Sequence, residues 1–300
     1  MTKRNTTHCV LYHANCYDGL GAAWAIRKQL GDTADYIPVQ YGESPPDVTG
    51  KHVIIADFSF SPLVLRIMEE KAASLTLLDH HASAKDMLQD YQCLCPGTHI
   101  EFDMKRSGAM MAWNHFHPNQ EPPLLLQHIQ DQDLWNWEMP HSEAFLRNLS
   151  SYPMSMQTYD KVANFSSDEY EQFVRQGQGL VAQFKTFVSE FVNRALPVEL
   201  DGIQGFHVAT SHHFRNEVGS ALARKRNTFG LLWQVDSNCI KVSLRSVDQC
   251  DVKDIAVRFG GGGHPTAASF NLPLERLPEL IAGKLQSPLY AASLMDNPRT

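Results

Sequence analysis

The chain has 300 residues, a hydrophobic content of 43% and a formal net charge of −7. These values are typical of a folded protein of about two domains and exclude a disordered chain. The acidic charge argues against a long nucleic acid as partner, because many phosphates would have to be neutralised, but not against a short substrate held by a few local cations.

The first part of the chain alternates predicted strands and helices. Ser61 and Pro62 give one of these helices a clear start, as N-cap and first helical residue. This rhythm predicts a parallel sheet with helices on both faces. The expected strands are 8–13, 36–41, 52–57 and 74–79, and the expected helices are 19–30, 61–73, 107–116 and 124–130.

After Trp137 the pattern changes. A long helix is expected over 168–195, because its apolar residues recur at about the helical period, and Pro197 ends it. Strands at 205–210, 230–236 and 240–244 and a helix at 217–225 then predict a second, smaller α/β domain. The expected domains are 1–150 for a first domain, 151–196 for a linker with the connecting helix, and 197–290 for the second domain.

Asp79, His80 and His81 close the apolar run 75–78, which is typical of a buried parallel strand. The carboxyl ends of such strands are where open α/β sheets bind ligands. A chance pairing of two histidines with an acid is the alternative, but two upstream strands end in similar groups.

The strand at 8–13 ends at His13 and leads to Asp18 and Gly19, and the strand at 52–57 ends at Asp57. Either acid could merely cap a turn or a helix. Three strand ends at one sheet edge, each with His or Asp, instead indicate a site for divalent metals that cleave phosphate esters.

Two further acids, Asp131 and Asp133, follow the apolar helix at 124–130 and could reach the same edge. Asp131 is the preferred metal ligand because it directly follows the helix, with Asp133 as the alternative. The nearby Trp135 and Trp137 could equally pack on the core.

The segment 260–265 contains four consecutive glycines and ends in His264 and Pro265. Ordering so many glycines costs chain entropy, so a group such as a phosphate is expected to approach their backbone closely. The residues that follow, 266–268, look helical. Arg245, at a strand end upstream, suits bidentate phosphate contacts, although a surface salt bridge is the more common role of an arginine.

In this order, the motifs resemble those of the DHH/DHHA1 phosphoesterases, in particular the stand-alone oligoribonucleases, or nanoRNases, and the resemblance covers nearly the whole chain. It implies a DHH domain with a parallel sheet and helices on both faces, followed by a smaller α/β DHHA1 domain. The segments that carry it are 13–18, Asp57, 79–81, Asp131 or Asp133, and the GGGH motif made of Gly261, Gly262, Gly263 and His264.

The resemblance also implies two divalent cations, with manganese expected. Asp57 would bridge both. His13 would bind one, while Asp18, His80 and Asp131 would bind the other. Residues implied to act on the substrate are His81 at the scissile phosphate, and Arg245, Gly261, Gly262, Gly263 and His264 at its other end.

One departure from the family pattern is Cys16, which stands where an aspartate is expected. It could be a thiolate ligand, which would favour zinc or iron over manganese, or simply a small buried cysteine. Magnesium, zinc or iron(II) stays an alternative to manganese at the site near Cys16. Asn15 could instead supply a weak oxygen ligand.

The expected function is a manganese-dependent phosphodiesterase that hydrolyses very short oligonucleotides or dinucleotides, such as linear diguanylate, to mononucleotides in a cleft between the domains. The alternatives are a 3′-phosphoadenosine 5′-phosphate phosphatase and a nucleotide-binding sensor without turnover. Six cysteines without a C-x-x-C pair and the lack of a signal-peptide core predict a cytoplasmic location. No membrane partner is expected, and a homodimer stays an open alternative.

Overall fold

The computed structural model describes residues 6–247 and 250–288. The chain divides into two compact units, residues 1–181 and 182–300. The last two residues of the expected second domain, 289 and 290, lie outside the described part.

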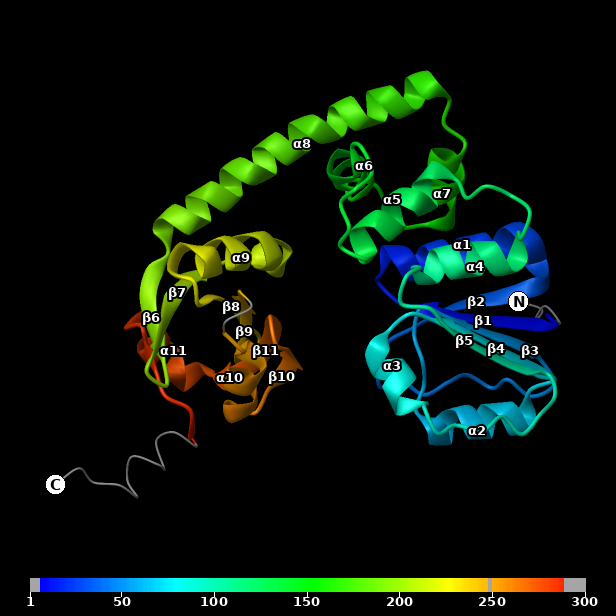
Figure 1. The fold of residues 1–300 in the computed structure, drawn as a ribbon, viewed down its shortest axis with the longest axis horizontal. Coiled ribbons are helices and arrows are strands. Elements are labelled where there is room, and N and C mark those ends of the chain that lie inside the picture. Colours follow the sequence, from blue (N-terminus) through cyan, green and yellow to red (C-terminus); the bar gives the residue numbers. More distant parts are fainter. Residues whose placement is uncertain (1–5, 248–249, 289–300) are drawn as a thin grey trace. The chain divides into compact units, whose positions relative to one another are not determined.

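The N-terminal unit is built on a five-stranded sheet in the order β2-β1-β3-β4-β5, and every neighbouring pair is parallel. Helices α1 and α4 cover one face, and α2 and α3 cover the other (Figure 1). The predicted α/β architecture is therefore confirmed. The strands are β1 (His8–His13), β2 (Ala34–Val39), β3 (His52–Ala56), β4 (Ser74–Asp79) and β5 (Thr98–Phe102), and these helices are α1 (Tyr17–Leu30), α2 (Pro62–Lys71), α3 (Ala82–Met87) and α4 (Gly108–Phe116).

The central strands alternate their apolar side chains between two cores. Ile54 and Leu78 pack with α1 and α4, while Ile55 and Leu77 pack on the opposite side with Leu65 of α2. Because both faces are covered, these strands are apolar at nearly every position. The charged and imidazole side chains of these strands therefore lie at or beyond the strand ends.

The remaining helices of the N-terminal unit pack on its α1 side. The last of them, α8, is 28 residues long and continues into the C-terminal unit. Among the described residues, no helix is both long enough and apolar enough to cross a membrane. These helices are α5 (Leu124–Asp133), α6 (Ser142–Leu149), α7 (Met156–Ala163) and α8 (Ser167–Arg194), and a 3-10 turn, η1 (Gly31–Thr33), follows α1.

The C-terminal unit contains a mixed seven-stranded sheet in the order β10-β11-β9-β8-β7-β6-β12. Helix α9 connects the parallel strands β7 and β8 and packs against them. Its strands are β6 (Leu196–Leu200), β7 (Ile203–Ala209), β8 (Phe229–Asp236), β9 (Cys239–Ser246), β10 (Gly262–His264), β11 (Ala267–Pro273) and β12 (Lys284–Leu285). Its helices are α9 (Arg215–Arg226), α10 (Val252–Arg258) and α11 (Leu277–Ile281), with 3-10 turns η2 (His212–Phe214) and η3 (Leu274–Arg276).

One local expectation was wrong. Residues 266–268 do not begin a helix: Ala267 and Ala268 start strand β11, which pairs antiparallel with the glycine-containing strand β10. Alanine favours helices, but here pairing on both sides, with β10 and β9, overrides that local preference.

Candidate active site at the strand ends

The ends of β1, β3 and β4 bring His13, Asp57 and His80 together. His80 Nε2 lies 3.1 Å from Asp57 Oδ1, and His13 Nδ1 lies 3.6 Å from Asp57 Oδ2. The buried Asp57 thus has one imidazole on each side of its carboxylate.

The surroundings of Asp57 leave two buried polar atoms without a hydrogen-bond partner among the described residues. These atoms are Asp57 Oδ2 and His13 Nδ1. The backbone of Asp57 also has a φ of 65°, a conformation that a non-glycine residue seldom adopts and that is common at functional sites. A cation between the two atoms would satisfy both of them.

Asp18, in the first turn of α1, is held by the amino end of α4. The backbone N–H groups of Gly108 and Ala109 donate to its carboxylate at 2.6 and 3.0 Å. Its Oδ2 atom lies 3.7 Å from His80 Nε2. The carboxylate is therefore fixed beside the His80 imidazole.

Gly108 is a residue of this site that the sequence did not reveal. A Cβ atom at this position would lie 2.6 Å from Asp57 Cβ, so only glycine lets α4 approach the end of β3. Ser107 caps α4 by accepting from Met110 N, and in the sequence it indicates where the helix begins. It does not indicate which residues this end of the helix contacts.

Of the two acids at the end of α5, the structure places Asp133 in the cluster. Asp133 Oδ2 lies 3.3 Å from His80 Nε2. Asp131 is buried and instead accepts backbone hydrogen bonds from Glu138 and Met139, at 2.8 and 3.2 Å. The expectation that Asp131 would lie beside the other site residues is thus corrected. Asp131 orders the loop after α5, and Asp133 is the acid grouped with Asp18 and His80.

His81 is oriented by Asp79. Its Nδ1 atom lies 2.7 Å from Asp79 Oδ1, whose other oxygen accepts from Ser59 Oγ at 2.7 Å. The Asp79 carboxylate raises the pKa of His81, although burial opposes this. Since Nδ1 is engaged, Nε2 is the nitrogen left for other contacts.

Cys16 lies within reach of the cluster: a ligand atom from each of His13, Cys16 and Asp57 fits within 4.8 Å of the others. Burial raises the pKa of the Cys16 thiol, and the carboxylates of Asp57 and Asp18 raise it further. The thiol therefore stays protonated unless a cation displaces the proton.

The clustered carboxylates repel one another. Burial raises the pKa of Asp18 well above its usual value, and Asp57 and Asp133 add to this rise. Burial would also raise the pKa of Asp57, but His13 and His80 beside it outweigh burial and hold it below its usual range. Bound divalent cations would relieve this repulsion.

The donor set fits two divalent cations. One group consists of His13, Cys16 and Asp57, and the other of Asp18, His80 and Asp133. His80 contacts Asp57, so this carboxylate adjoins both groups. The carboxylate ligands suit manganese and magnesium, and the imidazole ligands suit iron(II) and zinc.

In the C-terminal unit, Arg245 is half-buried and held by helix α9. Its Nε and Nη2 atoms donate to Asn216 Oδ1 at 3.0 and 2.7 Å, and Nη1 donates to the Leu244 carbonyl at 2.7 Å. A Cβ atom at Gly219 would lie 2.7 Å from Arg245 Cγ, so this glycine makes room for the side chain. The Arg245 guanidinium, which is expected to contact a phosphate, is thus held in place, and it keeps further N–H groups that can donate to an anion.

Strand pairing aligns Arg245 with His264. Ala267 of β11 pairs with Arg245 on one side and with His264 on the other. Residues directly opposite each other in a sheet share a face, so the two basic side chains flank the small Ala267.

The glycines before His264 have structural roles as well. Strand β11 approaches Gly261 and Gly263 so closely that neither could carry a Cβ atom, and Gly263 has a φ of 144°. Gly262 has open space at this position. Of the three glycines, only Gly262 leaves room for a ligand on the side where a Cβ would point.

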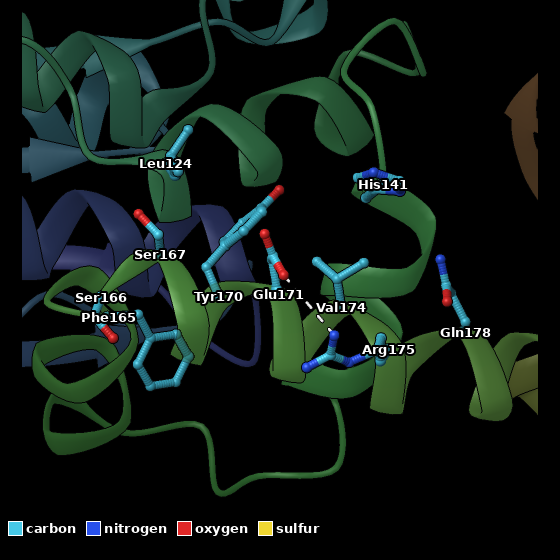
Figure 2. A pocket seen from close by; sticks show the side chains of 10 residues that line it. All are labelled: Leu124, His141, Phe165, Ser166, Ser167, Tyr170, Glu171, Val174, Arg175 and Gln178. Carbon is cyan, nitrogen blue, oxygen red and sulfur yellow. Dashed lines mark ion pairs between the residues drawn. The ribbon is translucent and has the colours of Figure 1, made fainter.

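A pocket of about 470 Å³ lies in another part of the N-terminal unit, between the start of α5 and the first turns of α8. Figure 2 shows it lined by Phe165, Tyr170 and Val174, with an ion pair between Glu171 and Arg175. The two side chains of this pair lie 3.8 Å apart. It shares no residue with the cluster at the strand ends, which is called the His–Asp cluster below and consists of His13, Cys16, Asp18, Asp57, His80, His81 and Asp133. The pocket is therefore not the site just described.

Comparisons with known proteins agree with this two-part organisation. The family model of the DHHA1 domain matches residues 206–284. The uncharacterized protein R106 of Acanthamoeba polyphaga mimivirus is 28% identical over 86% of this chain, which spans 66% of that relative's length. The solved structure of the pGpG-specific phosphodiesterase PggH from Vibrio cholerae matches with a TM-score of 0.55 at 16% identity, over 97% of this chain and 100% of that one. The C-terminal part of the predicted resemblance is confirmed, because a DHHA1 domain lies in residues 206–284, and the fold of the chain is similar to that of this phosphodiesterase.

Proposed function

We propose that this protein is a metal-dependent phosphodiesterase that cleaves dinucleotides, such as linear diguanylate, to mononucleotides. The observation that carries the proposal is the buried Asp57 carboxylate between His13 and His80, with Asp57 Oδ2 and His13 Nδ1 unsatisfied. The shared fold with a pGpG-specific phosphodiesterase suggests the class of substrate.

In this proposal, Asp57 contributes to both cation sites. His13 and Cys16 complete one, and Asp18, His80 and Asp133 complete the other. Manganese is the proposed ion, with magnesium, zinc or iron(II) as alternatives beside Cys16. When bound, such a pair of ions activates water and offsets the negative charge of a phosphodiester.

In this proposal, His81 donates a hydrogen bond to the phosphate. Asp79 fixes its ring through Nδ1 and favours its protonated form, so Nε2–H can donate to a non-bridging oxygen. Because this hydrogen bond strengthens as charge develops on the phosphate, His81 acts mainly in the transition state.

Two exposed tryptophans favour a nucleotide substrate over inorganic polyphosphate. Trp135 and Trp137 follow Asp133 by two and four residues, and their rings meet edge to face at 5.3 Å. Aromatic rings of this kind stack on bases. Phe259 is not available for stacking, because it is buried against Phe270 at 4.5 Å.

Product analysis tests the proposal. Purified protein is incubated with manganese and labelled oligoribonucleotides of graded length, linear diguanylate included, and a His81→Ala preparation controls for contaminating nucleases. We expect two mononucleotides from each dinucleotide and slower cleavage as length increases. A preference for strands longer than about ten nucleotides would contradict the electrostatic argument from the acidic chain.

The same assay separates the alternatives. Release of inorganic phosphate from 3′-phosphoadenosine 5′-phosphate without dinucleotide cleavage would identify a monophosphatase. A sensor would bind dinucleotide, equally well after His81→Ala, and hydrolyse nothing with any metal. The Cys16 departure is the observation that keeps the sensor in consideration.

A further inference from the structure

Strand β5 and helix α4 form a second group of side chains that could hold a metal ion. His99 and Glu101 of strand β5 and His115 of helix α4 each offer a ligand atom within 4.8 Å of the other two. None of these residues belongs to the His–Asp cluster. Two imidazoles and one carboxylate form a set that borderline ions such as zinc prefer and that magnesium does not.

Strand alternation brings His99 and Glu101 to the side of α4. Ile100 and Phe102 of the same strand pack into the core on the α2 side, so His99 and Glu101, which alternate with them, point the other way. His115 sits in the last turn of α4, and its ring lies 5.6 Å from the His99 ring at an interplanar angle of 32°. The three side chains therefore converge from two elements.

Glu101 Oε2 and the His115 imidazole are the atoms of this group that are best placed to bind a cation. Glu101 Oε1 already accepts from Arg106 at 2.6 Å, and Oε2 lies 3.5 Å from His99 Nε2. Burial and the neighbouring His99 lower the pKa of His115. At neutral pH this imidazole is thus free of its extra proton and ready to act as a ligand.

We propose that His99, Glu101 and His115 form a surface zinc site that ties the edge strand β5 to helix α4. Strand β5 ends the sheet, and a cation held by both elements stabilises this edge. Helix α4 also holds Asp18 through its amino end, so the site braces an element that supports the His–Asp cluster. The proposal does not depend on the proposed hydrolysis.

Zinc content after equilibrium dialysis tests this site. We expect wild-type protein to retain one zinc ion more than His99→Ala or His115→Ala. His8→Ala is the matched control, because His8 also lies beside another imidazole, that of His52 at 5.0 Å, but belongs to no three-ligand group among the described residues. Equal zinc content in all four proteins would overturn the proposal.

Thermal unfolding gives a second measurement. At zinc concentrations far above the dissociation constant, we expect the wild-type melting temperature to rise by about 5 °C more than that of His115→Ala. A rise of the same size in both proteins would contradict the site.

Manganese-supported hydrolysis, measured without zinc, separates this site from the cluster at the strand ends. We expect His115→Ala to keep wild-type hydrolysis. If His115→Ala lost both zinc and hydrolysis, the zinc would belong to the catalytic centre and a separate site would be refuted. If wild-type protein hydrolyses no dinucleotide at all, the proposed function fails, while the zinc count still decides this inference.

Discussion

The two units place their functional side chains in different ways. In the N-terminal unit, carboxylates and imidazoles gather where parallel strands end, and a backbone N–H group holds Asp18 while the Asp79 carboxylate holds His81. In the C-terminal unit, antiparallel pairing sets Arg245 and His264 on one sheet face, and His264 is exposed. The first arrangement suits chemistry on a bound phosphate, and the second suits binding.

The difference also has an electrostatic side. Asp18, Asp57 and Asp133 crowd together in the N-terminal unit, and burial together with the other two carboxylates raises the pKa of Asp18, so the cluster opposes full ionisation. Arg245 meets mainly neutral partners, Asn216 and a carbonyl oxygen, so it stays available to an anion. Variants of the first unit should therefore change turnover and metal binding, and variants of the second should change substrate affinity.

The largest effect is expected for His80→Ala. Loss of an imidazole that contacts Asp57, Asp18 and Asp133 should lower kcat for dinucleotide hydrolysis at least about a hundredfold, because a metal ligand is missing. Steady-state kinetics with manganese measure this, and circular dichroism checks that the fold survives. Wild-type turnover in a folded His80→Ala protein would remove the cluster from the mechanism.

A drop in pH below about 6.5 should destabilise the N-terminal unit, because the buried His128 does not take up a proton in the folded chain. This buried imidazole lies 2.9 Å from both Ser142 Oγ and Tyr170 OH, and burial lowers its pKa to about 4, with Asp131 opposing and His141 reinforcing the shift. Below its ordinary pKa of about 6.5, the unfolded chain takes up a proton that the folded chain does not, so stability falls as pH drops from 6.5 toward 4.

At pH 5 this loss should be about 2 kcal/mol relative to pH 7, given about 1.4 kcal/mol per pH unit. Urea unfolding at the two pH values measures it, with His128→Gln as the variant that lacks the titrating group. The same pH dependence in both proteins would show that His128 does not stay neutral in the fold.

Replacing the two acids at the end of α5 one at a time should separate metal binding from stability. Asp133→Ala should weaken manganese binding about tenfold with little change in stability, since this carboxylate contacts His80. Asp131→Ala should lower the free energy of unfolding by about 1–3 kcal/mol, because two backbone N–H groups lose their acceptor. Manganese titration and urea unfolding of both variants provide the measurements, and the reverse pattern would restore Asp131 as the ligand.

The smallest effect is expected in the C-terminal unit. Arg245→Ala should raise KM for a dinucleotide about fivefold and leave kcat and metal content nearly unchanged, if the guanidinium contacts a substrate phosphate. Arg224→Ala, which removes an exposed arginine from the last turn of α9, is the matched control. An unchanged KM in Arg245→Ala would mean that this arginine only braces α9 through Asn216.

The sequence predicted the N-terminal unit well because its signals are local. Apolar runs that end in His or Asp marked β1, β3 and β4, and the carboxyl ends of parallel strands meet at one edge. Asp131 was preferred over Asp133 because nearness to the helix was the only criterion available. Helix α5 instead continues to Asp133, and Asp131 turns to the loop behind it.

Features that depend on distant parts of the chain escaped prediction. Gly108 touches Asp57 and Asp18 across many intervening residues, and no local pattern indicates this contact. The pairing of β10 with β11 likewise overrode the helical preference of the alanines after Pro265. Two of the glycines that suggested a phosphate cradle, Gly261 and Gly263, are required by β11 itself.

In the proposed site, the Asp57 carboxylate is shared by two cation-binding groups at the strand ends. Counting bound manganese by equilibrium dialysis tests it most directly, in wild-type protein and in Asp57→Asn, which keeps the size of the side chain and removes its charge. We predict two manganese ions per wild-type chain and a loss of affinity at both sites in Asp57→Asn. Two ions bound with unchanged affinity in Asp57→Asn would show that this carboxylate belongs to neither cation site.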